Sequence, residues 1–455
     1  MGLAMGATEK RGSVPLVSGS VLLGSAKDLQ RDQLGTYEQA MRDHGDHVRF
    51  RIGPPQIGFK FDAVFDPAGA RAVLSGATDT YVKDAPVMAE FRRLFGEGLF
   101  TLNGAEWRQR RRMLQPVFTR QRVAAHVPMM VEQAEELART MSRSDGEREP
   151  QLESAAMTYA TNVLGTAIFG DDITDAGPVI DRTFPLINHH AARRGLAPLR
   201  LPLRVPTPAN RAILEAQRAL RNLIERLIDH RQRGGPTNDL LGLLLQLRDP
   251  ESGEPLSATE IRDEALIFLL AGLDTPGGAL PLIVYLLGQD LQVQERARQE
   301  AREAARSGAW SLDALPFTSR VVDEALRLYP PAHTVPRMAT RATTLNDRPI
   351  PQGHIVAVNM WGLHRNSRIW DEPQCFRPDR FDETATAGRD PYAYLPFGGG
   401  PRTCIGIHFA RTELTLAIAA LLSSLRVHAP SSPPSISAGV TLASHALRCR
   451  FERIH

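Results

Sequence analysis

A glycine-rich loop near the C-terminus leads into a cysteine that could bind a metal. The segment 397–410 contains three consecutive glycines before Pro401, and such a run cannot form a regular helix or strand. An apolar helical pattern begins at Ile405, so Cys404 lies where a loop becomes a helix. Free backbone N–H groups and the helix dipole favour a thiolate at that position. We therefore expect Cys404 to be a ligand for a soft or borderline metal centre.

The residues around Cys404 decide between two interpretations. A lone cysteine in such a loop is more often buried and inert. Here Phe397, Gly400, Arg402 and Gly406 accompany it, and together they resemble the signature F-x-x-G-x-R-x-C-x-G of the haem-thiolate cytochrome P-450 family. The resemblance implies that Cys404 binds the iron of heme b (iron protoporphyrin IX). It also implies that Phe397, Arg402 and Gly406 lie against this cofactor.

The stretch 265–288 is nearly all apolar and would be flagged as a membrane span by a hydropathy window. Asp274 interrupts it, with Gly272, Pro276 and Gly277 close by, which argues against a span. A helix that is apolar on all sides is instead expected to be the buried axis of a large domain. We expect a kink at Pro276, because proline lacks an N–H and its ring pushes the Gly272 carbonyl away.

Residues 271–275 resemble the oxygen-activation motif of the same family, which implies that Gly272, Asp274 and Thr275 are catalytic. Gly272 leaves room for O2 and water beside the backbone, and the Thr275 hydroxyl can both donate and accept a hydrogen bond. Asp274 can relay protons inward from solvent. The alternative role for Asp274 is a solvent-linked salt bridge within a helix. Pro276 stands where the family commonly has Thr or Ser, so the path of proton delivery stays open.

Trp107 and Arg111 are four residues apart and share one face of a predicted helix. By itself this basic segment is a solvated helix face. The resemblance implies instead that both side chains donate to a haem propionate, with Arg337 and Arg402 as further propionate ligands.

Glu324 and Arg327 are three residues apart on another predicted helix and resemble the family's ExxR element. The resemblance implies that Arg380 completes a buried structural triad with them. We expect this triad to stabilise the cysteine side of the haem without touching substrate.

Composition excludes several classes of protein. The chain has 455 residues, 42% hydrophobic and 23% charged, which is typical of a globular protein. A formal charge of +3 is too small and dispersed for nucleic-acid binding. The three cysteines lack disulfide spacing, which favours a reducing compartment. Residues 1–28 lack the apolar block of a signal peptide or anchor. We expect a loose leader there and a cytoplasmic protein without a membrane anchor.

Helical patterns dominate the sequence, whereas alternation at 47–65 and 350–361 predicts strands, and a further strand is expected at 332–337. Segment 81–101 is expected to be rich in loops. Length alone would suggest about three domains. The resemblance covers essentially the whole chain and implies a single triangular domain at 29–455. Its fold is mainly α with a small β-rich lobe (α+β), and segment 173–208 is a lid over the substrate entrance.

The resemblance implies a monooxygenase that inserts one oxygen atom of O2 into a C–H or C=C bond. The segments expected to line the pocket are largely apolar and predict a lipophilic substrate; they are 91–102, 184–206, 266–274, 333–335 and 440–442. Segment 206–211 resembles terpenoid-oxidising actinobacterial members. A terpenoid is therefore the first expectation, and a macrolide or other secondary metabolite the second.

Electrons must come from separate proteins, because the sequence shows no flavin or iron–sulfur segment. We expect a ferredoxin and its ferredoxin reductase, with Arg108, Arg110 and Arg112 forming a basic face for the acidic ferredoxin. Two alternatives remain. One is a haem-thiolate peroxygenase or isomerase, against which Asp274 and Thr275 argue. The other is a haem-binding sensor or carrier without turnover, in which that acid–alcohol pair would have no role.

Overall fold

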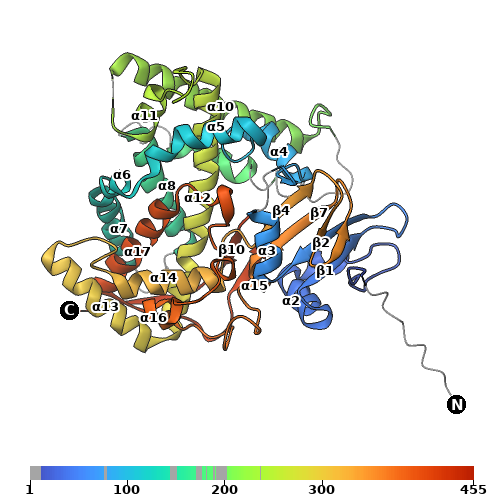
Figure 1. Cartoon of the computed structure of the whole chain (residues 1–455). Helices are drawn as coiled ribbons and strands as arrows, with labels where there is room; N and C mark the ends of the chain where they lie inside the picture. The colour runs from blue at the N-terminus through green and yellow to red at the C-terminus, as the bar shows by residue number, and fades with distance from the viewer. Residues whose placement is uncertain are drawn as a thin grey trace. The chain divides into compact units, whose positions relative to one another are not determined.

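The computed structural model describes residues 12–75, 79–143, 151–170, 177–180, 182–187, 190, 202–235 and 237–454. They form two compact units (Figure 1). The described parts of residues 1–85, 334–373 and 390–402 make unit 1, and those of 86–333, 374–389 and 403–455 make unit 2.

Unit 1 is built on a five-stranded sheet with strand order β1-β2-β7-β4-β3. Strands β1 and β2 form the antiparallel pair predicted from the alternation at 47–65, and β7 lies parallel to β2. The strands of this sheet are β1 (His47–Ile52), β2 (Phe59–Val64), β3 (Tyr81–Val82), β4 (Thr334–Ala339) and β7 (Ile355–Asn359).

Short helices cover this sheet, and α3 (Pro67–Leu74) lies over it in Figure 1. Asp66 begins α3 by accepting the Gly69 N–H, and Val73 and Leu74 then pack on the sheet residues Val356 and Val358. The other elements of unit 1 are α1 (Ala26–Arg31), α2 (Gln33–His44), α15 (Met360–Leu363) and the hairpin of β5 (Thr343–Leu345) with β6 (Arg348–Ile350).

Part of the predicted leader pairs with this sheet. The Val17 N–H donates to the Arg49 carbonyl at 2.8 Å, and the Arg49 N–H donates to the Pro15 carbonyl at 2.7 Å. These bonds place residues 15–17 alongside β1. Residues 1–11 lie outside the described part of the chain.

Unit 2 contains the long helices. Two strand pairs accompany them, β8 (Leu425–His428) with β11 (Arg450–Arg453) and β9 (Ser435–Ala438) with β10 (Leu442–His445). Its helices are α4 (Pro86–Phe95), α5 (Gly104–Leu114), α6 (Arg120–Ala124), α7 (Val127–Ser142), α8 (Leu152–Phe169), α10 (Pro208–Gly234), α11 (Leu240–Gln246), α12 (Ala258–Gln289), α13 (Leu291–Ser307), α14 (Pro316–Leu328), α16 (Glu383–Thr386) and α17 (Ile407–Ser424).

The expectation of a loop-rich segment at 81–101 was wrong for its central part. Helix α4 occupies residues 86–95, because Met88, Phe91, Leu94 and Phe95 recur at helical spacing and are all buried. The glycines that suggested a loop, Gly96 and Gly98, follow its last residue, and Pro86 lies in its first turn.

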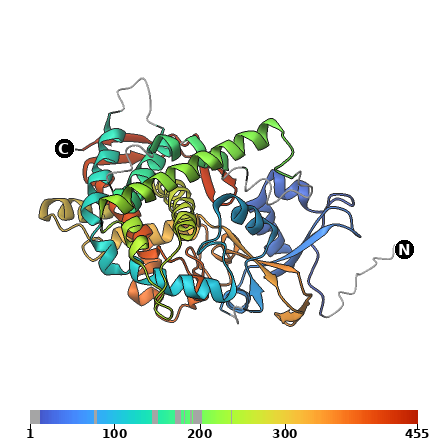
Figure 2. The same ribbon diagram turned by 90° about the horizontal axis from the view of Figure 1, so that it is seen from above.

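Helix α12 is the axis of unit 2, and Figure 2 looks nearly along it. A capping box between Ser257 and Glu260 begins the helix, which then continues through Pro276 and Pro281 to Gln289. Among the described residues it is the one helix long and apolar enough to cross a membrane. However, 78% of its most apolar window is buried inside the protein, as expected of a core helix.

The structure describes only part of the segment predicted to be a lid. Residues 173–176, 181, 188–189 and 191–201 of segment 173–208 lie outside the described residues. Beyond them, Thr207 caps α10 by accepting the Asn210 N–H.

Candidate functional site

The loop that carries Cys404 is short and tightly packed. A 3₁₀ turn at Gly400–Arg402 precedes it, and Gly406 is the N-cap of α17. Gly400 has a φ of +69°, and a side chain there would place its Cβ 2.2 Å from the Leu74 carbonyl oxygen, so only glycine is tolerated. The helix therefore begins three residues after Cys404, slightly later than the helical pattern from Ile405 predicted.

The electrostatics of Cys404 differ from the expectation based on the helix N-terminus. Its side chain is accessible to solvent. Nevertheless, the protein packed around it raises the pKa of the thiol, while a hydrogen bond from the Gly406 N–H and the charge of Arg111 lower it. Partial removal of water by the surrounding protein therefore outweighs the two interactions that favour a thiolate. Coordination to a metal would deprotonate the thiol outright.

Helix α5 supports the cysteine loop from the side. Arg111 Nη1 donates to the Thr403 carbonyl oxygen at 3.0 Å, beside Cys404. Trp107 lies one turn earlier on α5 and is buried. The structure thus brings Arg111 to the cysteine loop.

In unit 1, three cationic side chains gather, and one of them was missed by sequence reasoning. Burial lowers the pKa of Lys83, and the nearby charges of Arg337 and Arg402 lower it further. Burial lowers the pKa of Arg337 to about 10, and burial together with Arg337 lowers that of Arg402 to about 9, against the opposing charge of Asp84. Like charges buried together favour the binding of an anion between them. Haem carries two propionate carboxylates, so this cluster fits that cofactor.

A weak signal for Lys83 was present in the sequence. It is one of only four lysines, whereas arginine supplies the other 50 basic residues. Arginine and lysine are not interchangeable at sites that bind carboxylates. Nothing local, however, connects Lys83 with Arg337 or Arg402, which are hundreds of residues away.

The predicted oxygen-activation residues lie in the middle of α12. Thr275 Oγ1 donates to the Ala271 carbonyl at 2.6 Å. Asp274 is half-buried, and burial raises the pKa of its carboxyl to about 6. At Gly272, a Cβ would lie 2.8 Å from the Leu164 side chain of α8, so close helix packing also favours glycine there.

One apolar cluster connects this motif to the cysteine loop. Leu273 of α12 belongs to it, and Ile405, the residue after Cys404, packs against it. The cluster also contains Phe91 and Leu270, with Val440 at its edge. Phe184 and Leu203 belong to it as well, so described residues of four of the segments predicted to line the pocket meet in unit 2. His333 is buried, and its Nε2 is 3.1 Å from the Gly439 carbonyl, which agrees with a structural role.

Glu324, Arg327 and Arg380 are in direct contact. Arg327 is fully buried and donates to both carboxylate oxygens of Glu324 at 2.7 and 2.8 Å. Arg380 Nε donates to the same carboxylate at 3.2 Å, and the Arg377 N–H donates at 2.9 Å. The carboxylate is thus surrounded by donors in an interior site.

The side chains available to bind a metal suit a haem. Within the described residues, no group of three or more His, Cys, Asp or Glu side chains could hold a bare metal ion. A single accessible cysteine suits an iron that is already held by the four nitrogens of a macrocycle. Phe397 lies in unit 1 and Gly406 in unit 2, each on the same loop as Cys404.

Comparisons with known proteins agree with this geometry. The family model described as "Cytochrome P-450" matches residues 15–451. Cyclooctatin synthase of Streptomyces melanosporofaciens is 31% identical over 91% of this chain and 89% of its own. Pentalenene oxygenase of Streptomyces avermitilis is 30% identical over 91% of this chain and 90% of its own. The crystal structure of the cytochrome P-450DA heme domain superposes with a TM-score of 0.87 at 24% identity, covering 97% of this chain and 98% of the other.

The mainly helical fold with a small β region is therefore that of a known haem protein, and the cofactor is heme b. Enzymes of this kind use O2 and electrons from redox partners to oxidise lipophilic molecules, as the name of a third relative, cyclooctat-9-en-7-ol 5-monooxygenase, illustrates. With the family model matching nearly the whole chain, the protein belongs to the cytochrome P-450 family of monooxygenases.

Proposed function

We propose that this protein is a monooxygenase of terpenoid metabolism, which inserts one oxygen atom of O2 into a C–H or C=C bond of its substrate. The observation that carries the proposal is the position of Asp274 and Thr275. They flank the apolar cluster that includes Leu273 and extends to Ile405 beside Cys404. A proton relay at the edge of an apolar pocket suits oxygen activation next to a lipophilic substrate.

The side chains of this protein would hold the cofactor in two ways. Cys404 would bind the iron, and the cationic or N–H donors Trp107, Arg111, Lys83, Arg337 and Arg402 would bind the propionates. When bound, the haem supplies the activation of O2, with the thiolate favouring O–O cleavage.

Protons are delivered by the protein itself. Asp274, with a pKa of about 6, takes a proton from solvent and passes it inward near neutral pH. The Thr275 hydroxyl, next to Asp274 on α12, is the group of the protein that would hold this proton beside the O2 site. In the structure that hydroxyl donates to the Ala271 carbonyl, so it must rotate to act.

The substrate class rests on the apolar cluster and on the relatives. The cluster offers Phe, Leu and Val side chains, which suit a hydrocarbon-rich molecule. The similar Streptomyces proteins include a pentalenene oxygenase and a cyclooctat-9-en-7-ol 5-monooxygenase, so the two named substrates are a hydrocarbon and an alcohol of one. A terpenoid is therefore the proposed substrate, with another secondary metabolite as the second choice.

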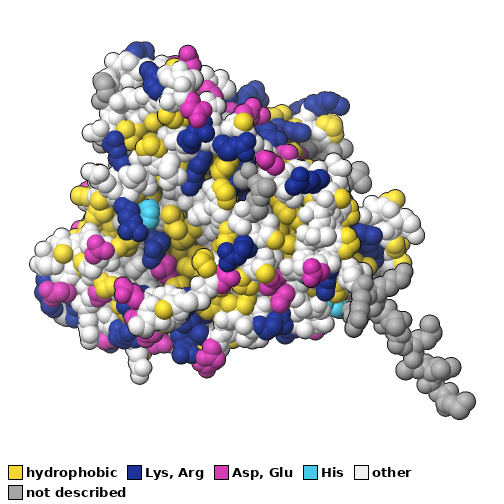
Figure 3. All heavy atoms as spheres, viewed as in Figure 1, with side chains coloured by type: hydrophobic (Ala, Val, Ile, Leu, Met, Phe, Trp, Pro, Cys, Tyr) yellow, Lys and Arg dark blue, Asp and Glu magenta, His cyan; other side chains and the backbone are white. Residues whose placement is uncertain are grey.

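A ferredoxin and its reductase are the proposed electron donors, and the docking face needs one correction. The sequence placed Arg110 on that face, but the structure buries it in contact with Glu260 and Glu264. Lys and Arg side chains do gather over α5 in Figure 3. The exposed ones on α5 and α6 are Arg108, Arg112, Arg120 and Arg122. This face would attract an acidic ferredoxin in the cytoplasm.

Spectral titration of the ferric protein tests the substrate class. Terpene hydrocarbons and alcohols, macrolides and fatty acids would each be added, and the shift of the Soret band measured. We expect saturable shifts with terpenoids. Shifts confined to macrolides or fatty acids would contradict the proposal.

Turnover separates the proposed reaction from its alternatives. With surrogate ferredoxin, reductase and NADPH, a monooxygenase consumes O2 and forms one product per NADPH at full coupling. A peroxygenase or isomerase forms product without NADPH, and a carrier forms none. The carbon monoxide difference spectrum of the ferrous protein tests Cys404, because its red-shifted Soret band requires thiolate ligation and should be lost in Cys404→His.

A further inference from the structure

The loop between α4 and α5 is held by two adjacent carboxylates of α12. Asp263 Oδ2 accepts the Glu97 N–H at 2.9 Å, and Glu264 Oε1 accepts the Leu99 N–H at 2.9 Å. Both carboxylates are at least nine-tenths buried, and Glu264 is fully buried. Residues 96–102, here called the 96–102 loop, are thus bound to α12 through their backbone.

Glycines make this approach possible. Gly96 has a φ of +91°, and a Cβ there would lie 2.1 Å from the Asp263 carboxyl carbon. At Gly98 a Cβ would lie 2.9 Å from that of Glu264. Thr101 closes the loop on itself, since its hydroxyl donates to the Gly96 carbonyl at 2.9 Å. The sequence of the loop is therefore fitted to the two acids.

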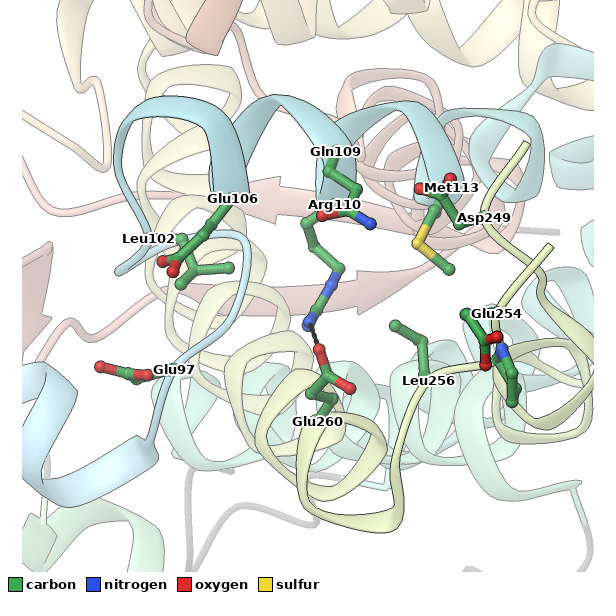
Figure 4. A pocket seen from close by; sticks show the side chains of 11 residues that line it. Glu97, Leu102, Glu106, Gln109, Arg110, Met113, Asp249, Glu254, Leu256 and Glu260 are labelled. Carbon is green, nitrogen blue, oxygen red and sulfur yellow. Dashed lines mark hydrogen bonds and ion pairs between the residues drawn. The ribbon is translucent and has the colours of Figure 1, made fainter. Parts of the chain in front are cut away.

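Arg110 connects the same acids to α5. Its Nη1 donates to Glu264 Oε1 at 2.7 Å, and its Nη2 contacts Glu260. Figure 4 shows Arg110 reaching from α5 toward Glu260, beside Leu102 and Glu97. The hollow seen there has a volume of about 220 Å³ and gives solvent access to this ion pair. Neither Cys404 nor Asp274 lines it, so it is separate from the haem site.

The 96–102 loop faces the proposed substrate region on its other side. Leu99 and Leu102 belong to the apolar cluster that contains Leu273, and Phe100 packs against it. The Phe100 ring meets that of Phe91 edge to face, at 5.6 Å between centroids. A shift of this loop would therefore change the shape of the cluster next to Asp274.

We propose that Asp263 and Glu264 are positioning residues for substrate selection, which hold the 96–102 loop closed against the apolar pocket and thereby restrict the size of the ligand admitted. The inference rests on the proposed function, because it takes the apolar cluster as the substrate pocket. Neither residue touches the haem ligands or the oxygen-activation residues in the contacts described above.

The closed loop should respond to pH. Burial raises the pKa of Glu264 to about 7, with Arg110 and the Leu99 N–H opposing and Asp263 adding to the rise. Among the described residues, the charged groups that act on Glu264 are thus Arg110 from α5 and Asp263 from α12. Arg110 also forms an ion pair with Glu260. Glu264 Oε2 has no hydrogen-bond partner within the described part of the chain, which also favours protonation.

The sign follows from linkage. Closure buries Glu264 and raises its pKa above the ordinary value of 4.5, so the closed loop binds the proton more tightly than an open, hydrated one. The contribution of Glu264 to closure is therefore present in acid and is lost as the pH rises through about 7. Opening at higher pH would admit larger ligands.

Hydrogen exchange of the holoprotein tests the contact directly. In Glu264→Ala the amide of Leu99 should exchange about tenfold faster than in the wild type, after correction for intrinsic rates, because its acceptor is gone. Glu264→Gln retains an acceptor oxygen, so its loop should stay closed and lose the dependence on pH between about 6 and 8. Glu260→Gln is the matched control, since it also faces Arg110 but does not contact the loop, and should behave as wild type.

Ligand selection separates positioning from a merely structural role. The probes are 1,2,4-triazole and a bulky triazole with two phenyl rings, which bind haem iron and do not titrate in this pH range. In Glu264→Ala, association of the bulky probe should accelerate about threefold or more relative to the small one. If Glu264→Ala does not fold, Asp263→Ala replaces it, with Glu97 as the reporting amide. Faster exchange without altered discrimination, or no change in either, would overturn the inference. Because both probes bind the iron itself, failure of the terpenoid proposal would not affect this result.

Discussion

Two carboxylates of unit 2 face opposite electrostatic surroundings. Glu324 accepts hydrogen bonds from Arg327, Arg380 and the Arg377 N–H, all inside the protein. Asp274 lies in α12, where burial dominates and raises the pKa of its carboxyl to about 6. Donors surround the first carboxylate, whereas burial makes the second titrate near neutral pH. The difference suggests that Glu324 serves the fold and that Asp274 serves proton transfer.

Removing the Glu324 charge should have the largest effect. In Glu324→Gln two buried guanidinium groups lose their anion, so the free energy of unfolding should fall by about 3–5 kcal/mol. Denaturant titration and haem content of the purified protein would measure this. The matched control is Glu303→Gln, because Glu303 and Arg306 form the same i,i+3 pair at 71% and 72% exposure. If both variants lost the same free energy of unfolding, the stabilising effect of the triad would not depend on its burial.

The Asp274→Asn variant should fold and bind substrate but turn over about 100-fold more slowly, because the amide cannot relay protons. The readouts are product formation, the ferric spectral titration and thermal unfolding. Asp229→Asn on an exposed turn of α10 is the control. A loss of stability without a loss of turnover would mean that Asp274 resembles Glu324 after all.

The pH dependence of coupling gives the third test. Above about pH 6 the protonated fraction of Asp274 falls, approaching tenfold per unit, so product per NADPH should decrease between about pH 6 and 8. Its raised pKa also means that its contribution to stability, present below the ordinary value of 3.8, is lost as the pH rises through about 6. Asp274→Asn should remove both dependences. If coupling in Asp274→Asn depended on pH as it does in the wild type, Asp274 would not be the proton-transfer group.

Thr275→Ala should have the smallest effect, a loss of coupling of about three- to tenfold with substrate affinity unchanged. Oxygen consumed as peroxide and water, compared with product formed, measures it. Thr275→Ser retains the hydroxyl and should restore most of the coupling. Equal coupling in all three proteins would show that Thr275 only bonds to the Ala271 carbonyl.

Local sequence patterns predicted the elements that carry the chemistry. The Gly-rich loop before Cys404, the capped α12 and the Glu324–Arg327 spacing are short-range features, and each lies where expected. The exception is α4, which lies in a segment that its glycines and scattered phenylalanines had suggested to be rich in loops. Turn-forming residues at the ends of a short helix resemble those of a loop, so only burial of Phe91 and Phe95 distinguishes the two.

Side chains that act through distant partners were not predictable. In the sequence, Arg110 belongs to a run of arginines that was expected to form a basic surface. In the structure it points inward, because Glu260 and Glu264 in the first turns of α12 lie beside it. Its neighbour Arg111, one residue on, points to the cysteine loop instead. A helix turns by about 100° per residue, so adjacent arginines reach different partners.

The sequence by itself determined the family, and it predicted the metal ligand and the oxygen-activation motif, because each of these patterns lies within a few adjacent residues or turns. Tertiary structure alone decided that Lys83 joins Arg337 and Arg402, and that Asp263 and Glu264 hold the 96–102 loop. The physical reason is range. Backbone propensity and periodicity act between near neighbours in the sequence. The charge and burial of these groups depend instead on which distant parts of the 455-residue chain come into contact in the fold.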